Sequence, residues 1–202
     1  TATINGTQIA ATVPFGTDVT ALVATFAHDG VSVTVGGTPQ VSGTTANSFA
    51  SPVQYVVTAG NATTKTYTVT VTIAANPAKD ITAFGFLDAT NPALSVDVTA
   101  TINNTAITAT VPFGTDVTAL VATFTTTGAM VQVGATPQAS GITANSFAAP
   151  VQYVVTAADS TTKTYTVTVT VAPSPAKDIT AFSFLDTTNT ALSADITATI
   201  NN

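Results

Sequence analysis

Acid–base and nucleophilic catalysis need a positioned histidine, a carboxylate pair or an activated nucleophile. His28 is the only histidine, and the chain contains no cysteine and no glutamate. A histidine works as a general acid or base when a carboxylate and a nucleophile lie within hydrogen-bond reach. Asp29 follows His28, but the chain repeats itself every 98 residues, and the repeat has Thr126 and Thr127 at these positions. We therefore interpret the pair as solvated loop residues, predict no catalytic residue and expect no enzymatic activity.

The aspartates offer a second kind of chemistry, because calcium binds six to eight oxygen ligands that include carboxylates. Six of the ten Asp residues fall near the predicted linkers and the loops that follow them: Asp80, Asp88, Asp97, Asp178, Asp186 and Asp195. No D-x-D-x-D run occurs among them, so turn and capping roles are the simpler interpretation. We expect no cofactor, with calcium at these six residues as the weaker alternative.

Aromatic side chains could form a platform for sugars, but the sequence places most of them inside. There is no Trp, and all four tyrosines fall on the inward face of predicted strands: Tyr55, Tyr67, Tyr153 and Tyr165. Phe15 and Phe113, each in a Pro-Phe-Gly turn, are the only rings expected to be exposed. We favour a core role for the other aromatic residues.

The charge balance excludes two classes of partner. The net charge is −6, with four Lys and no Arg, so the basic clusters that bind nucleic acid or anionic membranes are absent. Only 7% of the residues are charged, and Thr, which makes up 46 of the 202 residues, must supply the polar surface. No apolar run approaches the ~18 residues of a membrane-spanning helix.

The 98-residue repeat organises the whole chain. Thr1–Asn5 recurs as Thr99–Asn103 and again as Thr197–Asn201, and the overlap needs no gap, with roughly three quarters of its positions identical. This period is too long for a solenoid unit and fits a complete small domain.

Within each repeat, apolar and polar residues alternate as in strands with one buried face. In Thr66–Ile73, the Tyr, Val and Ile side chains share one face and four Thr share the other. Asn5-Gly6 and its counterpart Asn103-Asn104 are hairpin signals. The sequence predicts an all-β protein of tandem immunoglobulin-like sandwiches with about seven strands per 98-residue repeat.

The predicted domains are out of phase with the ends of the chain. We expect an immunoglobulin-like repeat over 1–75 without its own first strand, a linker at 76–80, a complete repeat over 78–173, a second linker at 174–178, and the first strands of a third repeat over 179–202. Because the chain starts at Thr1 rather than Met, we expect it to be processed or excised from a longer chain.

A sandwich that lacks one strand exposes an apolar groove and an open sheet edge. Neighbouring residues of a longer tandem array would supply the missing strand in the same chain. Alternatively, the terminal strand over 179–202 would fill the groove of another subunit by donor-strand exchange, in a head-to-tail contact that propagates into a filament. Both arrangements predict a linear fibre.

Four blocks of the sequence resemble the immunoglobulin-like repeats of bacterial surface and adhesin-type proteins, including cadherin-like β-sandwich modules: Ile81–Phe86, Val111–Val117, Pro150–Ala157 and Lys163–Val169. The resemblance covers essentially the whole chain. It implies a β-sandwich fold, a surface location and a spacer, stalk or filament role, and it brings no catalytic residues.

Taken together, these features predict a structural segment of a secreted or cell-surface fibre. Its expected partner is another copy of itself, head to tail, with no nucleic acid and no membrane insertion. The alternative is an adhesin or carbohydrate-binding module of a larger surface protein, with any glycan or surface ligand bound elsewhere in that protein.

Overall fold

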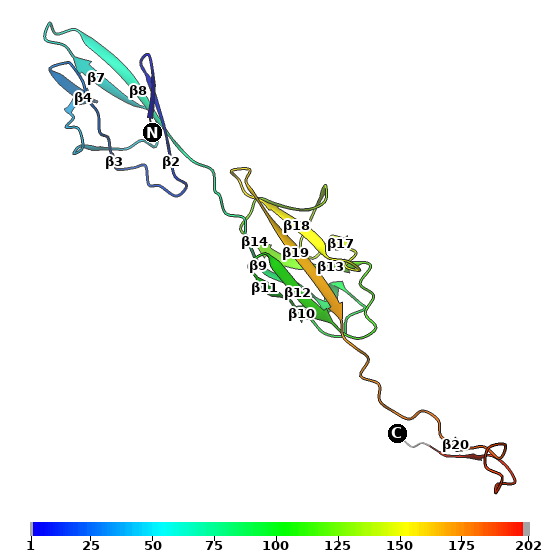
Figure 1. The fold of residues 1–202 in the computed structure, drawn as a ribbon. Helices are drawn as coiled ribbons and strands as arrows, with labels where there is room; N and C mark the ends of the chain where they lie inside the picture. The colour runs from blue at the N-terminus through cyan, green and yellow to red at the C-terminus, as the bar shows by residue number, and fades with distance from the viewer. Residues whose placement is uncertain (1, 200–202) are drawn as a thin grey trace.

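The computed structural model describes residues 2–199, which are all-β apart from one turn of 3-10 helix at η1 (Asp88–Thr90). Figure 1 shows three parts in chain order: a first repeat in blue and cyan, a second repeat in green to orange, and a terminal segment in red. Extended linkers join them. None of the described residues forms a helix long and apolar enough to cross a membrane. Thr1 and the last three residues of the predicted third repeat lie outside the described residues.

One long sheet forms the body of the first repeat, with strand order β1-β2-β8-β7-β4-β5. Its strands are β1 (Ala2–Asn5), β2 (Gln8–Val13), β4 (Ser32–Val35), β5 (Thr38–Pro39), β7 (Val53–Thr58) and β8 (Thr64–Ile73). A short pair, β3 (Leu22–Val23) with β6 (Ala46–Asn47), lies apart from this sheet. The alternation in β8 predicted from the sequence therefore belongs to a central strand of the sheet.

The second repeat has the same sheet and also a cover over it. The shared part consists of β11 (Thr101–Asn103), β12 (Ala106–Val111), β15 (Met130–Val133), β16 (Thr136–Pro137), β18 (Val151–Thr156) and β19 (Thr162–Val171), with the pair β13 (Leu120–Val121) and β17 (Ala144–Asn145). The cover is a three-stranded sheet in the order β10 (Val98–Thr99), β9 (Ile81–Phe86), β14 (Thr123–Thr126). Two layers thus enclose a core, as in a sandwich.

The expected number of about seven strands per repeat is reached only when the two-residue strands are not counted. Seven strands of the second repeat, β9 to β19, have three or more residues, and the remaining four have two residues each. The protein is therefore all-β with two similar sandwich-like repeats, whereas the immunoglobulin-like assignment and the domain boundaries remain predictions.

A tight turn after Asn5 joins β1 to β2, as the sequence predicts. Asn5 pairs with Gln8 across the turn, and Gly6 adopts a φ of +61°. At the matching position of the second repeat, Asn104 adopts a φ of +55°, which asparagine tolerates better than most residues. The next pairing was not predicted, because β2 runs parallel to β8, and β12 runs parallel to β19.

The tyrosines face inward, as the sequence predicts. Tyr153 and Tyr165 are almost completely buried in the core of the second repeat. The Tyr153 hydroxyl accepts a hydrogen bond from the Asn145 Nδ2 atom at 3.1 Å, and burial raises the pKa of Tyr153. Tyr55 and Asn47 make the same contact in the first repeat at 3.1 Å.

The terminal segment forms a small hairpin of β20 (Ser183–Phe184) and β21 (Ile196–Thr197). Its pairing repeats that of β9 with β10, because Phe184 lies opposite Ile196 as Phe86 lies opposite Val98. Phe184 is 50% exposed, however, whereas Phe86 is fully buried. The segment therefore has the local structure of the β9 cover without a sheet beneath it.

Candidate functional site

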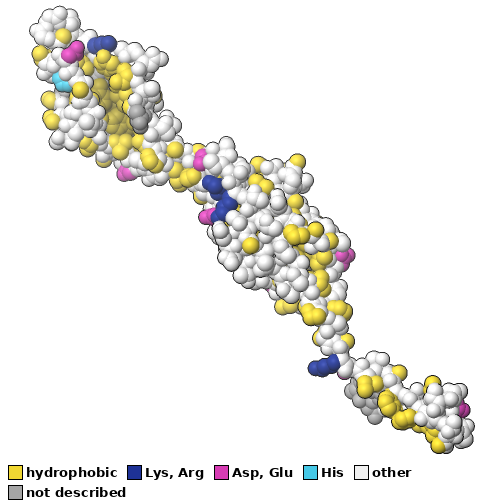
Figure 2. All heavy atoms as spheres, viewed as in Figure 1, with side chains coloured by type: hydrophobic (Ala, Val, Ile, Leu, Met, Phe, Trp, Pro, Cys, Tyr) yellow, Lys and Arg dark blue, Asp and Glu magenta, His cyan; other side chains and the backbone are white. Residues whose placement is uncertain are grey.

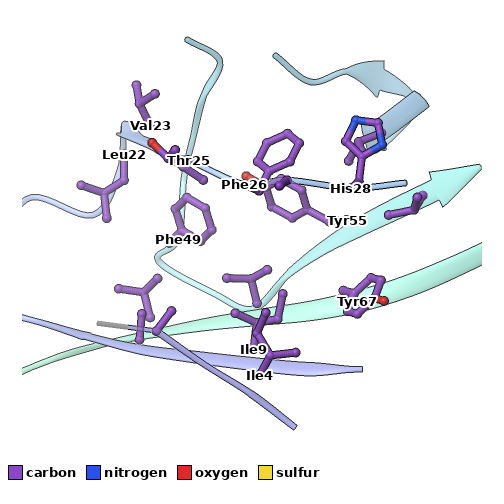
Figure 3. A pocket seen from close by; sticks show the side chains of 18 of the residues that line it. Ile4, Ile9, Leu22, Val23, Thr25, Phe26, His28, Phe49, Tyr55 and Tyr67 are labelled. Atoms are coloured by element: carbon purple, nitrogen blue, oxygen red, sulfur yellow. The ribbon is translucent and has the colours of Figure 1, made fainter. Parts of the chain in front are cut away.

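An open apolar groove of about 940 Å³ runs along the first repeat. Figure 2 shows it as a hollowed band of hydrophobic side chains on the upper part of the molecule, and Figure 3 shows the residues that line it. Strands β1, β2, β7 and β8 contribute residues to one wall, among them Ile4 and Ile9. The segment from Leu22 to Asp29 contributes the facing wall.

The same side chains form the core of the second repeat. Ile107, Val111 and Tyr165 are buried there, and their neighbours in the core include Phe84 and Phe86 of β9. In the first repeat, the counterparts Ile9, Val13 and Tyr67 are only half-buried. The groove is therefore the place that β9 occupies in the second repeat.

The core of the first repeat is correspondingly small. Its buried cluster contains four residues, Val33, Phe49, Val53 and Tyr55, against fifteen in the second repeat. Ile4, in the outer strand of the sheet, is 68% exposed. Exposed apolar surfaces of this size are typical of faces that another segment or molecule covers.

The predicted loop pair lies at one end of this groove. His28 and Asp29 line it and are both exposed, and the imidazole of His28 lies 6.1 Å from the ring of Phe26 (Figure 3). At the matching positions of the second repeat, the Thr126 and Thr127 side chains contact the backbone of Asp80, where the linker enters the repeat. His28 and Asp29 therefore lie at the end of the groove that corresponds to the place where the linker enters the second repeat.

The six aspartates considered for calcium are spread over several places. Asp97 accepts a hydrogen bond from the backbone N–H of Asp88 at 2.9 Å, and Asp195 accepts one from Asp186 at 2.9 Å. These two carboxylates cap the loop after the first strand of their segment. Among residues 2–199, no three His, Asp or Glu side chains gather in a way that could hold a metal ion, and calcium binding remains a hypothesis.

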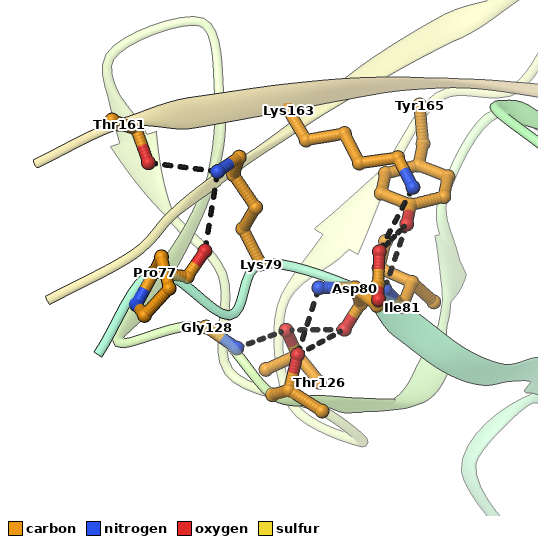
Figure 4. Close-up of polar contacts among 10 residues, drawn as sticks. Pro77, Lys79, Asp80, Ile81, Thr126, Gly128, Thr161, Lys163 and Tyr165 are labelled. Atoms are coloured by element: carbon orange, nitrogen blue, oxygen red, sulfur yellow. Dashed lines mark hydrogen bonds and ion pairs between the residues drawn. The ribbon is translucent and has the colours of Figure 1, made fainter. Parts of the chain in front are cut away.

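Asp80 has a different role that the sequence did not reveal. Its Oδ1 atom lies 2.8 Å from Lys163 Nζ and accepts a hydrogen bond from the Tyr165 hydroxyl at 3.2 Å (Figure 4). The hydrogen bond from Lys163 is the main reason why the pKa of Asp80 is lowered, and the same bond raises the pKa of Lys163. These contacts fix Asp80, the residue before β9, to the start of β19.

Lys79 strengthens the same junction. Its Nζ atom donates hydrogen bonds to Thr161 Oγ1 at 2.8 Å and to the Pro77 carbonyl at 3.1 Å. The sequence pattern alone did not predict the contact of Lys163 with Asp80. The spacing of Lys163 and Tyr165 was the available signal, because residues two apart on a strand share a face.

Lys65 and Tyr67 reproduce this spacing in the first repeat. Lys65 Nζ lies 5.1 Å from the centre of the Tyr67 ring, and Lys163 Nζ lies 5.0 Å from that of Tyr165. Within the described residues, the only ion pair is that of Lys163 with Asp80, so Lys65 has the geometry without the carboxylate.

Each repeat also presents one exposed ring on a hydrogen-bonded turn. Phe15 is 55% exposed and Phe113 is 59% exposed, as the sequence predicts. They are not the only exposed rings, however, because Phe182 and Phe184 of the terminal segment are 49% and 50% exposed. Beside Phe15, Thr17 Oγ1 donates to the Pro14 carbonyl at 2.8 Å. The side-chain hydroxyl and backbone N–H of Thr20 both donate to Asp18, which lowers the pKa of that carboxylate.

The fold defines a repetitive all-β protein. Its first repeat has an open apolar groove, and each of the two repeats presents one exposed phenylalanine ring. The chain belongs to the family described as "SGBP, N-terminal", whose profile matches residues 1–71 and 89–169. The second matched range begins at residue 89, after the end of β9 at Phe86. It therefore does not include β9. Among curated protein sequences, none matches the chain.

Two solved structures from Bacteroides are similar to parts of the chain. A Bacteroides thetaiotaomicron protein proposed to be a glycoside hydrolase is 33% identical over 56% of this chain, with a TM-score of 0.37. A Bacteroides fragilis protein proposed to be secreted is 20% identical over 49% of this chain and 99% of its own length, with a TM-score of 0.35. The matched region spans only 29% of the first of these structures.

Proposed function

We propose that this chain is the β-repeat part of a secreted surface protein that binds glycans and does not cleave them. The observation that carries this proposal is the family match over residues 1–71 and 89–169, since the family name designates surface glycan-binding proteins. This match favours the carbohydrate-binding alternative over the structural fibre that the sequence led us to expect.

The composition supports a binding role with neutral glycans as ligands. The net charge of −6 and the absence of Arg disfavour polysaccharides that carry uronic acids or sulfates. Hydrolysis of a glycosidic bond ordinarily uses two carboxylates that flank the bond. Asp88 and Asp97 approach each other through a backbone N–H, in a capping arrangement that suits a loop.

The exposed rings are the residues we assign to glycan contact. Sugars present apolar C–H faces that pack on aromatic rings, with hydroxyl groups that bond to nearby carboxylates and backbone groups. Phe15 with Asp18, and Phe113 with Asp116, offer such a pair once in each repeat. The groove is less suited to a sugar, because the lining contributed by its strands is almost entirely apolar.

The test is binding of the full chain to a panel of neutral polysaccharides by affinity electrophoresis and calorimetry, with release of reducing sugar measured in parallel. We expect retention by at least one polysaccharide without release. Each of the substitutions Phe15→Ala and Phe113→Ala should weaken binding at its own turn about three- to tenfold, because the aromatic packing is lost. The double variant should lose both contacts.

Ile142→Ala is the matched control, since Ile142 is 76% exposed and belongs to neither turn. This variant should bind as the unmodified chain does. Release of sugar by the purified chain, or retention by no polysaccharide in the panel, would overturn the proposal.

A further inference from the structure

We infer that the turns at residues 14–20 and 112–118 bind one polysaccharide chain at the same time, so that the ligand is a long neutral polymer. These turns carry the exposed rings of Phe15 and Phe113. The inference rests on the proposed function, because it takes the two rings as the glycan contacts. It adds the size of the ligand and the way in which the two repeats act together.

The two turns present the same surface to a ligand. Residues 11–26 and 109–124 are identical in sequence. In each turn the N–H of Thr17 or Thr115 donates to the carbonyl of the proline three residues earlier, at 3.2 Å in both. The glycine that follows each ring has a φ of +80° in both turns. A sugar that packs on one ring therefore finds the same contact on the other.

The aspartate beside each ring is oriented in the same way. Asp18 Oδ1 accepts from the N–H of Thr20 at 2.9 Å and from its hydroxyl at 2.6 Å, and Asp116 Oδ1 accepts the same pair from Thr118 at 2.9 and 2.7 Å. No described residue donates to the Oδ2 atom of either carboxylate. This oxygen is therefore the acceptor that we assign to a sugar hydroxyl in each turn.

The joint between the repeats leaves one residue unrestrained. The N–H of Ala74 donates to the Val13 carbonyl at 2.8 Å, so the first repeat holds the chain as far as residue 74. The N–H of Asp159 donates to the Asn76 carbonyl at 3.3 Å, so the second repeat holds the chain from residue 76. Ala75 lies between them and makes no hydrogen bond to any described residue.

The linker after Ala75 is part of the structure of the second repeat. Asn76 Oδ1 accepts from the N–H of Ala78 at 2.9 Å, and Pro77 keeps the preceding residue extended. The N–H of Asp80 donates to Thr127 Oγ1 at 2.8 Å, and the N–H of Thr127 donates to the Asp80 carbonyl at 2.9 Å. These bonds add to those of Lys79 and Lys163 (Figure 4).

The path of the chain gives the distance between the two rings. Residues 75–80 extend at most about 20 Å, and they end at Asp80, which contacts Lys163 at the start of β19. From Lys163 to Val171 the strand spans about 27 Å, and Val171 pairs with Val111, just before the second turn. The rings lie at the same end of their repeats (Figure 1), so roughly 50 Å separates them.

This separation selects a long ligand. A tetrasaccharide is far shorter than the distance between the rings and reaches only one turn, whereas a polysaccharide reaches both. Once one turn has bound, the joint keeps the second turn close to the same polymer, which raises its effective concentration. The affinity for the polymer then depends on the product of the two contacts, so a change at either turn reduces it by its full factor.

The experiment is calorimetry of the full chain with matched polymers and tetrasaccharides. The pairs are soluble starch with maltotetraose, galactomannan with mannotetraose, and mixed-linkage β-glucan with its tetrasaccharide. For the carbohydrate that binds, we expect the tetrasaccharide to occupy two equal sites per chain. The polymer should bind at least about tenfold more tightly than its tetrasaccharide.

The ring variants separate joint binding from independent binding. On the polymer, Phe15→Ala and Phe113→Ala should each cost about three- to tenfold in affinity, and the double variant about ten- to 100-fold. Independent turns would give less than about a twofold loss for each single variant, because the other turn still binds, and only about three- to tenfold for the double variant. Ile142→Ala serves again as the control.

Insertions in the linkers test the role of the joint. Ten Gly and Ser residues inserted after Ala75 should weaken binding of the polymer at least about threefold and leave the tetrasaccharide unaffected, because they disperse the distance between the turns. The same insertion after Ser174 is the matched control, since Ser174 lies beyond both turns. It should change neither affinity.

The outcomes distinguish this inference from the proposed function. A polymer that binds no more tightly than its tetrasaccharide, single variants within about twofold of the unmodified chain, or equal effects of the two insertions would each overturn the inference and leave glycan binding in place. Binding of none of these carbohydrates would overturn both.

Discussion

At the scale of single residues, we expect the contacts of Asp80 to make the stability of the second repeat depend on pH. Its folded pKa lies below the ordinary value of 3.8, because Lys163 and Tyr165 donate to the carboxylate. A lowered folded pKa means that the contribution to stability is complete above the ordinary value and is lost as the pH falls through the folded value.

We therefore expect Asp80→Asn to shift the denaturation midpoint of the second repeat downward at neutral pH, and to leave it nearly unchanged in acid below the folded pKa. The measurement is urea denaturation of both proteins over that pH range. Lys65→Gln, at the corresponding position without an ion-pair partner among the described residues, should be neutral throughout in dilute protein. An equal loss for Asp80→Asn at every pH would contradict this assignment.

Asn91 is a second residue whose effect can be predicted. Its side chain satisfies both backbone groups of Val121 in a buried position, so Asn91→Ala leaves a buried N–H and C=O without partners. We expect a loss of about 2–3 kcal/mol in the free energy of unfolding of the second repeat. Asn189→Ala in dilute protein should cost almost nothing, and a similar loss in both variants would argue against the role of burial.

At the scale of elements, much of the architecture could be predicted from the sequence. Alternation places Tyr153 and Tyr165 inward, the Asn5-Gly6 turn defines the first hairpin, and the missing first strand predicts the open groove. Alternation reports which face of a strand is buried and not which strand lies beside it, so the parallel pairing of β2 with β8 was not foreseen.

The site was predictable only in part, for a related reason. The exposure of Phe15 and Phe113 follows from their Pro-Phe-Gly turns. The contact of Asp80 with Lys163 joins residues 83 positions apart, and no local pattern indicates such a distant pair. His28 could be recognised as a variable position, but its place at the entrance of the groove depends on the fold.

At the scale of the whole molecule, we expect the amide hydrogens of the two repeats to differ in their protection from exchange, although the two sequences are similar. The second repeat buries fifteen core residues and the first buries four. Local opening is easier where fewer apolar contacts must be broken. We expect the amide hydrogens of β7 and β8 to exchange faster than those of β18 and β19 in dilute protein.

Hydrogen–deuterium exchange with mass spectrometry measures this difference. Equal protection of the two repeats would mean that the first repeat does not need a cover to be stable.

The parallel pairing of β12 with β19 has a mechanical consequence. The chain enters β12 at Ala106 and leaves β19 at Val171, at opposite ends of the parallel ladder, so tension that reaches both strands draws them in opposite directions along their length. Their six paired residues from Ala106 to Val111 then carry the load in shear at the same time, in place of separating one after another. We therefore expect this ladder to resist tension as a unit and to break in a single step.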